Sequence, residues 1–131
     1  MGNAITDNMK IGAVGKLLVQ LRLLEFGVQA APPLKDTGND LIAVRGEVFR
    51  GMQIKTTASN KTCNRPLPDH YHILALVRLE ATDVQLFLDR SDIYLVPRSV
   101  VESGGGLPKD LAEFAISRAH VDALFPPAEN R

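Results

Sequence analysis

The sequence predicts a single α/β domain in which a long helix precedes a series of β-strands. The chain has 131 residues, a length that suits one domain with a real hydrophobic core. Its composition, 45% hydrophobic and 23% charged, excludes a disordered chain and a coiled coil. The apolar spacing is helical in residues 8–26 and changes to short extended runs beyond them, which indicates mixed secondary structure.

The first predicted element is a helix over residues 8–26. Leu17, Leu21 and Leu24 belong to an unusually wide apolar stripe at helical spacing, which predicts a buried helix. Gly27 suits the left-handed position after its end. Extended apolar runs bounded by Gly, Pro or turn-forming residues follow it and predict strands at 28–31, 41–44, 73–79, 84–88 and 93–96.

The C-terminal part fits two arrangements. Residues 108–125 fit a helix with Pro108 in its first turn and Pro126 after its end. Residues 114–116 fit equally well a short strand that precedes a shorter helix. Both alternatives are kept at this point.

The charge and cysteine content limit the partners and the compartment. The 15 Lys and Arg residues balance the 15 Asp and Glu residues, so no overall field favours a polyanion. Cys63 is the single cysteine and cannot form an internal disulfide, so we expect a cytoplasmic protein. The longest apolar run, residues 73–77, is far shorter than the roughly 20 residues that a membrane-spanning helix needs, and no membrane partner is expected.

A predicted hairpin places polar residues from two strands opposite each other. If Gly46 and Glu47 form a two-residue turn, Arg45 pairs with Val48 and the same register sets Asp40 opposite Gln53. Side chains alternate between the faces of a strand, so a carboxylate, an amide and, two residues further on, an ammonium share one face. The ordinary alternative is the exposed polar face of a hairpin.

One feature of the sequence supports this cluster of polar side chains, and another could remove it. Gln53 and Lys55 flank Ile54 on one predicted strand, so their side chains point the same way. A bulge at Gly51 would shift the register by one residue and remove the pairing with Asp40.

Residues 48–68 contain only basic charges. Arg50, Lys61 and Arg65 lie in this segment, which contains no Asp or Glu. Such a local excess favours contacts with the phosphates of DNA. A loop that is charged only for solubility is the alternative. We expect residues 56–69 to form a loop.

The histidines give no metal motif. His70 and His72 would share one face of a strand, but no third His or Cys lies at ligand spacing. They are therefore interpreted as ordinary polar or core histidines and not as a zinc site.

The order of these motifs resembles that of the PD-(D/E)XK nuclease superfamily. The helix with Gly15-Lys16, then Asp40, then the hairpin and Gln53-Ile54-Lys55 are similar to the QxK variant found in an intron-encoded homing endonuclease, and also to archaeal Holliday-junction resolvases. The resemblance covers residues 11–97. It implies a restriction-endonuclease-like core, a mixed β-sheet with flanking helices, within a single domain of residues 1–131 (core about 8–97, C-terminal extension 98–131).

The resemblance implies metal-dependent hydrolysis of phosphodiester bonds in DNA. Asp40 would bind Mg²⁺ or another divalent ion through its carboxylate, Gln53 through its amide oxygen and Ile54 through its backbone carbonyl. Lys55 would orient the attacking water or help to deprotonate it. A small domain needs a second copy to reach both DNA strands, so a homodimer or homotetramer is expected.

One departure from the family concerns the first helix. Lys16 stands where these nucleases usually have a Glu, so Asp40 is left as the single acid of the motif. An ammonium near the site would repel a divalent ion. Either the motif is aligned differently, or another acid such as Asp36 enters, or the chain is impaired as an endonuclease. The alternatives are a non-catalytic DNA-binding or assembly module on the same fold, and a protein-interaction domain.

Overall fold

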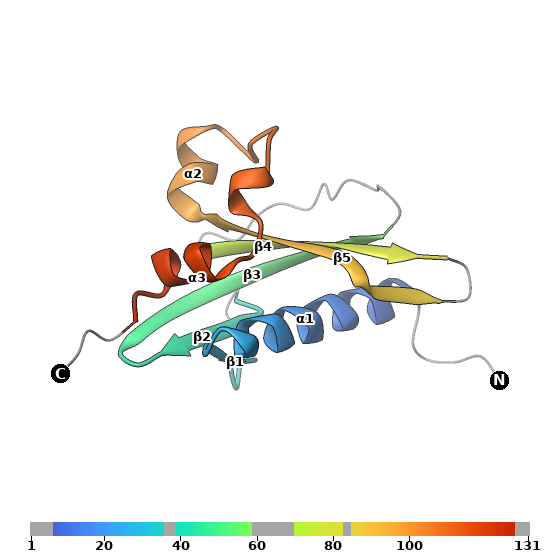
Figure 1. The fold of residues 1–131 in the computed structure, drawn as a ribbon, viewed down its shortest axis with the longest axis horizontal. Coiled ribbons are helices and arrows are strands. Elements are labelled where there is room, and N and C mark those ends of the chain that lie inside the picture. Colours follow the sequence, from blue (N-terminus) through green and yellow to red (C-terminus); the bar gives the residue numbers. More distant parts are fainter. Residues whose placement is uncertain (1–6, 36–38, 59–69, 83–84, 128–131) are drawn as a thin grey trace.

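The computed structural model describes residues 7–35, 39–58, 70–82 and 85–127. Their five strands lie in chain order in one sheet, with β3 and β4 parallel and the other neighbours antiparallel. Helices flank this mixed sheet (Figure 1), so the predicted α/β fold class is confirmed. The strands are β1 (Gln29–Ala31), β2 (Leu41–Arg45), β3 (Val48–Ala58), β4 (Ile73–Ala81) and β5 (Leu86–Pro97), and the helices are α1 (Asp7–Glu25), α2 (Arg98–Ser103), the 3₁₀ helix η1 (Ala112–Phe114) and α3 (Arg118–Leu124).

Helix α1 buries one side and exposes the other. Leu18, Val19 and Leu23 are buried against the sheet, and Gly27 ends the helix with a φ of 81°. The prediction of a buried helix is wrong for the opposite side, because the stripe is wide enough to cover two faces of the helix. The leucines left exposed there are Leu17 (64%), Leu21 (56%) and Leu24 (59%). No helix among the described residues is long and apolar enough to cross a membrane.

The predicted hairpin register is confirmed. Arg45 pairs with Val48, and the pairing runs without a shift to Leu41 and Met52. Gly46 has a φ of 59°, the positive value that the first turn position of this hairpin favours. Gly51 pairs in register, so the hairpin contains no bulge there.

Strand β3 changes its pairing partners at Met52. Its first half pairs with β2 as far as Met52, and β4 begins to pair with it only at that residue, opposite Ile73. Among the described residues, the β4 side of residues 48–51 and the β2 side of residues 53–58 therefore lack a neighbouring strand. These two open edges lie on opposite sides of one strand.

Strand β5 is one long strand rather than the two predicted at 84–88 and 93–96. Its ladder with β4 pairs residues 92–97 in one register and residues 86–87 in another, and the shift between Arg78 and Glu80 leaves residues 88–91 without a partner on β4. The Ser91 hydroxyl accepts a hydrogen bond from the Glu80 amide at 3.1 Å. This side-chain bond joins the two strands where the ladder is interrupted, so the polar residues form a bulge within one strand.

The C-terminal region follows the second predicted arrangement. Ala115 forms a β-bridge with Tyr94, and the hydroxyl of Ser117 then caps α3 by accepting from the His120 amide. The short helix α2 was not predicted. It has only six residues, and the burial of Val101 against the sheet stabilises it rather than any local pattern.

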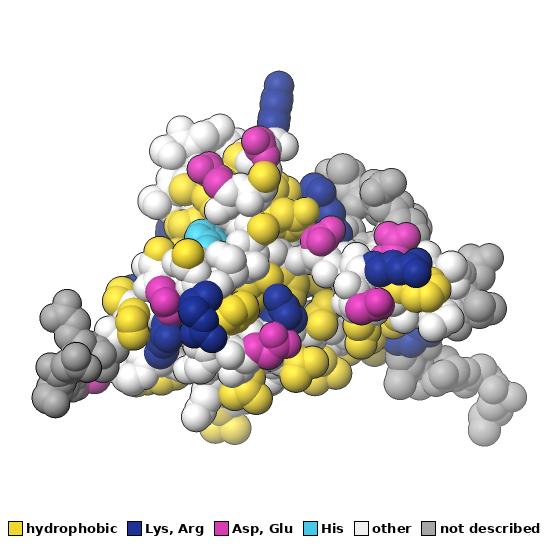
Figure 2. Space-filling view, viewed as in Figure 1, with side chains coloured by type: hydrophobic (Ala, Val, Ile, Leu, Met, Phe, Trp, Pro, Cys, Tyr) yellow, Lys and Arg dark blue, Asp and Glu magenta, His cyan; other side chains and the backbone are white. Residues whose placement is uncertain are grey.

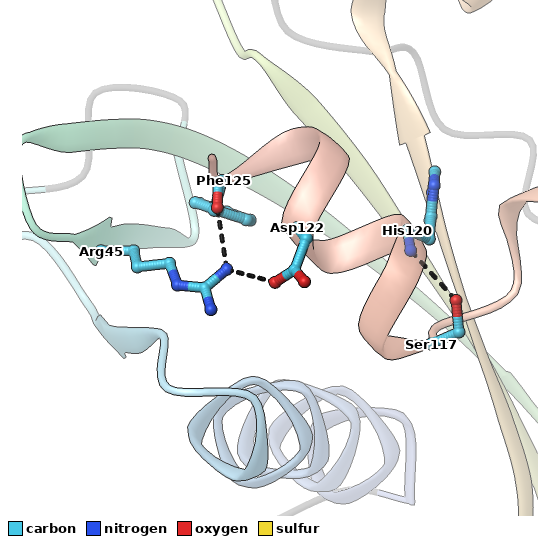
Figure 3. A network of polar contacts seen from close by, with 5 residues as sticks. All are labelled: Arg45, Ser117, His120, Asp122 and Phe125. Carbon is cyan, nitrogen blue, oxygen red and sulfur yellow. Dashed lines mark hydrogen bonds and ion pairs between the residues drawn. The ribbon is translucent and has the colours of Figure 1, made fainter. Parts of the chain in front are cut away.

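Two apolar cores cover the two faces of the sheet. The larger one contains α1 together with Val121 and Phe125, and the smaller one contains Val101 and Phe114. Figure 1 shows α2 and η1 together beside β5. Helix α3 is fixed to the hairpin by Arg45, which donates to the Asp122 carboxylate at 2.6 Å and to the Phe125 carbonyl at 2.9 Å (Figure 3).

Candidate functional site

Asp40 completes the open β2 edge of β3. Its amide donates to the Met52 carbonyl at 2.9 Å, and its Oδ2 accepts from the Ile54 amide at 2.8 Å. Regular pairing with β2 ends at Met52, so no strand is available to accept this N–H. The carboxylate therefore takes the place of the missing strand at Ile54.

The Ile54 carbonyl points to the same side as the Asp40 carboxylate. Within a strand, the N–H and C=O of one residue face the same neighbour, and the Ile54 N–H faces Asp40. Among the described residues, Oδ1 of Asp40 has no hydrogen-bond partner. An anionic oxygen, from the Asp40 carboxylate, and a neutral one, from the Ile54 carbonyl, therefore lie on the same side of β3, beyond the start of β2.

Gln53 and Lys55 lie on the face of the sheet opposite α1. Met52 and Ile54 pack into the larger core, so the intervening side chains point the other way. Alternation along β2 assigns Asp40 to this same face, because Leu41 lies in the larger core. Gln53 is half-buried, and Lys55, 8% exposed, is the one buried charged residue in the described part of the chain.

Lys16 lies on the helix side of the sheet. Gly15 before it approaches β3 so closely that a Cβ atom would overlap the Thr56 side chain. Lys16 itself is half-buried, and no ion pair joins it to Asp40 within the ranges that the structure describes. Gln20, on the same helix face, donates to the Ala30 carbonyl at 3.0 Å and fixes α1 to β1.

The residues present match a hard cation in ligand type but not in charge. Carboxylate, amide and carbonyl oxygens are the donors that Mg²⁺ accepts, together with waters. Across the described ranges, no group of three or more His, Cys, Asp or Glu side chains is placed to hold a metal ion. Three sequence candidates, Asp36, Lys61 and Arg65, lie outside the described residues.

The other open edge of β3 holds His72, which the sequence predicts to be an ordinary histidine, and Arg50, which it predicts to contact DNA. The Gly51 amide donates to Nδ1 of His72 at 2.8 Å, and Arg50 and Arg98 line a cavity beside them. His72 directly precedes β4, and Arg98 is the first residue of α2. Their position beside Arg50 therefore depends on the parallel pairing of β3 and β4. No local pattern in the sequence signals it.

Comparison with known proteins identifies the fold. A bacterial homing endonuclease, I-Ssp6803I, has a similar structure, with a TM-score of 0.57 at 16% sequence identity over 95% of this chain and 93% of that one. No protein-family model matches the chain. No curated protein matches it in sequence either. The chain therefore has a fold like that of a homing endonuclease, established by structure and not by sequence.

Proposed function

We propose that this chain is a DNA endonuclease of the PD-(D/E)XK type in its QxK variant. The observation that carries the proposal is the bond between the Asp40 carboxylate and the Ile54 amide, with Gln53 and buried Lys55 on the neighbouring positions of β3. The likeness to I-Ssp6803I, described as a homing endonuclease, supports it. We also propose that residues 1–131 act as one domain in the cytoplasm.

The roles of the residues follow from their chemistry. Asp40, Gln53 and the Ile54 carbonyl are the oxygen donors that would hold Mg²⁺ or another divalent ion. Such an ion, when bound, would supply Lewis-acid polarisation of a phosphate and activation of the attacking water. Lys55 would hold that water and stabilise the negative charge that grows on the phosphate, an effect that is stronger for a buried ammonium than for an exposed one.

Lys16 is proposed to impair this site across the open edge of β3, because it starts from the helix side of the sheet and not from the face that carries Gln53 and Lys55. The motif contributes one carboxylate against the two ammonium groups of Lys16 and Lys55, whereas a divalent ion needs net negative charge around it. The chain then retains the oxygen donors but holds the ion weakly. Little or no cleavage is expected from the unaltered sequence.

A cleavage assay tests the proposal on plasmid, supercoiled and branched DNA with Mg²⁺. Lys16→Glu should cut, and the added change Asp40→Asn should abolish the cutting because it removes the anionic ligand while keeping an oxygen for the Ile54 amide. Strong cutting by the unaltered chain that persists in Asp40→Ala would overturn the site. Strong cutting by the unaltered chain that is lost in Asp40→Ala would keep the site and overturn the role given to Lys16.

The second candidate is a DNA-binding or assembly module that does not cut. It is favoured by the scarcity of acids, since the described residues contain no cluster of three metal-binding side chains. DNA binding without cutting, in both the unaltered chain and Lys16→Glu, would select this candidate.

The basic segment of residues 48–68 is proposed to contact DNA phosphates through Arg50, Lys61 and Arg65. Lys61→Ala and Arg65→Ala should weaken binding to all duplex sequences and each lower the salt dependence by about one phosphate contact. An unchanged salt slope in an anisotropy titration would remove this segment from the interface.

A second copy of the chain is proposed to cover α1, giving a homodimer or homotetramer. Apolar side chains are exposed over α1 (Figure 2). Leu17 and Leu21 of this helix are both exposed by more than half. Leu17→Ser with Leu21→Ser should convert the oligomer to a monomer in light scattering after size exclusion. The matched control Leu34→Ser, which alters a fully exposed leucine outside α1, should leave the mass unchanged. A monomeric unaltered chain would contradict the proposal.

A further inference from the structure

The open β4 edge of β3 borders a cavity of about 460 Å³. Three backbone segments are joined beside it, because the His72 amide donates to the Gly51 carbonyl and the Arg98 amide donates to the His72 carbonyl, each at 2.9 Å. The cavity exists because β3 extends past the start of β4. Helix α3 closes one side through Ala123 and Leu124.

Two guanidinium groups lie at the wall of this cavity. Arg50 donates through Nε to the Leu124 carbonyl at 3.2 Å, and its terminal nitrogens have no partner among the described residues. Arg98 lies over the ring of Tyr71, 5.4 Å from the centroid, and pairs through Nε with Glu102 at 2.6 Å. Tyr71 and Leu124 both line the cavity, so their contacts place both guanidinium groups at it.

The third donor is the imidazole of His72. Its Nδ1 accepts the Gly51 amide proton at 2.8 Å, so in the neutral ring the proton lies on Nε2, which is free to donate. Asn39 adds a polar acceptor, because its Oδ1 is buried and finds no hydrogen-bond partner in the part of the chain that the structure describes. No Asp or Glu is among the described residues that line the cavity.

We propose that this cavity, the Arg50–Arg98 pocket, binds a phosphate group of the same DNA strand that reaches Asp40. Two guanidinium forks and an imidazole N–H match the several oxygens of a phosphate. The volume exceeds that of a lone phosphate ion and falls in the range of sites for larger ligands, which suits a phosphate with its sugars. The Asn39 oxygen then accepts from a water that is held beside the phosphate.

The spacing along β3 fits one strand. Gly51 at the pocket and Ile54 at the Asp40 edge are three residues apart, about 10 Å along a strand. DNA rises about 3.4 Å per base step, so roughly three steps cover this separation. The inference rests on the proposed function in taking DNA as the ligand, but it is tested without cleavage.

The test measures duplex DNA binding by anisotropy in EDTA across a range of salt concentrations. Arg50→Gln and Arg98→Gln should each weaken binding roughly tenfold, as expected for loss of a charge-assisted hydrogen bond to phosphate. Each should lower the salt slope by about 0.9. Arg90→Gln is the matched control, because Arg90 also lies over an aromatic ring, that of Phe87, but roughly 26 Å along β5 from Arg98.

Equal losses in Arg90→Gln and the two pocket variants would overturn the proposal, since a general loss of positive charge would then explain them. If thermal melting shows that a glutamine variant is not folded, Arg50→Lys and Arg98→Lys are compared with Arg90→Lys instead. They keep the charge but lose the fork, and must still weaken binding more than the control does.

Amide shifts in ¹⁵N spectra distinguish the source of the phosphate. Duplex DNA should shift the Gly51 and His72 amides. Shifts with inorganic phosphate alone, combined with unaltered DNA affinity in the variants, would overturn the assignment to DNA. Failure of the unaltered chain to bind DNA would instead refute the proposed function, which separates the two results.

Discussion

The two halves of β3 meet the same backbone problem with opposite chemistry. Where β2 has ended, the Ile54 amide donates to the Asp40 carboxylate at 2.8 Å. Where β4 has not begun, the Gly51 amide donates to the His72 imidazole at 2.8 Å. One open edge is therefore rich in oxygen and the other in nitrogen, and they lie on opposite sides of one strand.

The difference shows how a single change of pairing partner leaves two open edges, each of which a side chain completes. A fully paired central strand uses its backbone groups in the ladder, whereas each open edge needs a side chain to complete it. A carboxylate supplied for this purpose also attracts a cation. An imidazole supplied for the same purpose presents its second nitrogen as a donor to an anion.

The largest expected effect concerns the oxygen-rich edge. Lys16→Glu should raise Mg²⁺ affinity at least roughly tenfold in calorimetry, because it exchanges a repelling charge for an attracting one. The matched control Lys10→Glu makes the same change on an exposed position of α1 and should have little effect. Equal gains in both variants would show that Lys16 acts only through overall charge.

The packing of α1 beside the oxygen-rich edge predicts a difference between two glycines. Gly15→Ala should lower the free energy of unfolding by about 1–3 kcal/mol, because the new methyl group overlaps Thr56. Gly12 has open space around it, so Gly12→Ala should raise the free energy by about 0.5–1 kcal/mol through helix propensity. Urea unfolding measures both, and similar values would contradict the close approach of α1 to β3.

Loss of the Asp40 acceptor and loss of the His72 acceptor should lower the free energy of unfolding by similar amounts but should differ in their effect on Mg²⁺ binding. Asp40→Ala and His72→Ala should each cost about 1–2 kcal/mol in urea unfolding, because each leaves a backbone N–H without its acceptor. Asp40→Asn and His72→Gln retain an acceptor and should cost less. If His72→Ala reduces Mg²⁺ binding in the Lys16→Glu background as strongly as Asp40→Asn does, the contrast between the edges is wrong.

The smallest effect concerns Tyr71 at the nitrogen-rich edge. Burial raises the pKa of Tyr71 above its ordinary 10.0, against the opposing effect of the Arg98 guanidinium. The unfolded chain therefore loses this proton first, and the stability that Tyr71 contributes is lost as pH rises above 10. Thermal melting should show this loss in the unaltered chain and in Tyr94→Phe. A Tyr71→Phe variant with the same loss would exclude Tyr71 as its source.

The sequence by itself determined the features that depend on neighbouring residues. Helical spacing predicted α1, and the two-residue turn at Gly46 set the register that the structure shows from Arg45 and Val48 to Leu41 and Met52. That register by itself predicts that Asp40 lies next to β3, without any knowledge of tertiary contacts. Asp40 and Gln53-Ile54-Lys55 of the motif that resembles nucleases come together for the same reason, whereas Lys16 lies on α1, outside this hairpin.

Only the tertiary structure decided what lies on either side of that hairpin. Parallel pairing of β3 and β4 joins segments distant in the chain, and nothing local states that it begins at Met52. The Arg50–Arg98 pocket, the role of His72 and the formation of α2 all depend on it. The exposure of Leu17 and the position of Lys16 on the helix side likewise follow from how α1 docks, because spacing gives the faces of a helix but not which face the sheet covers.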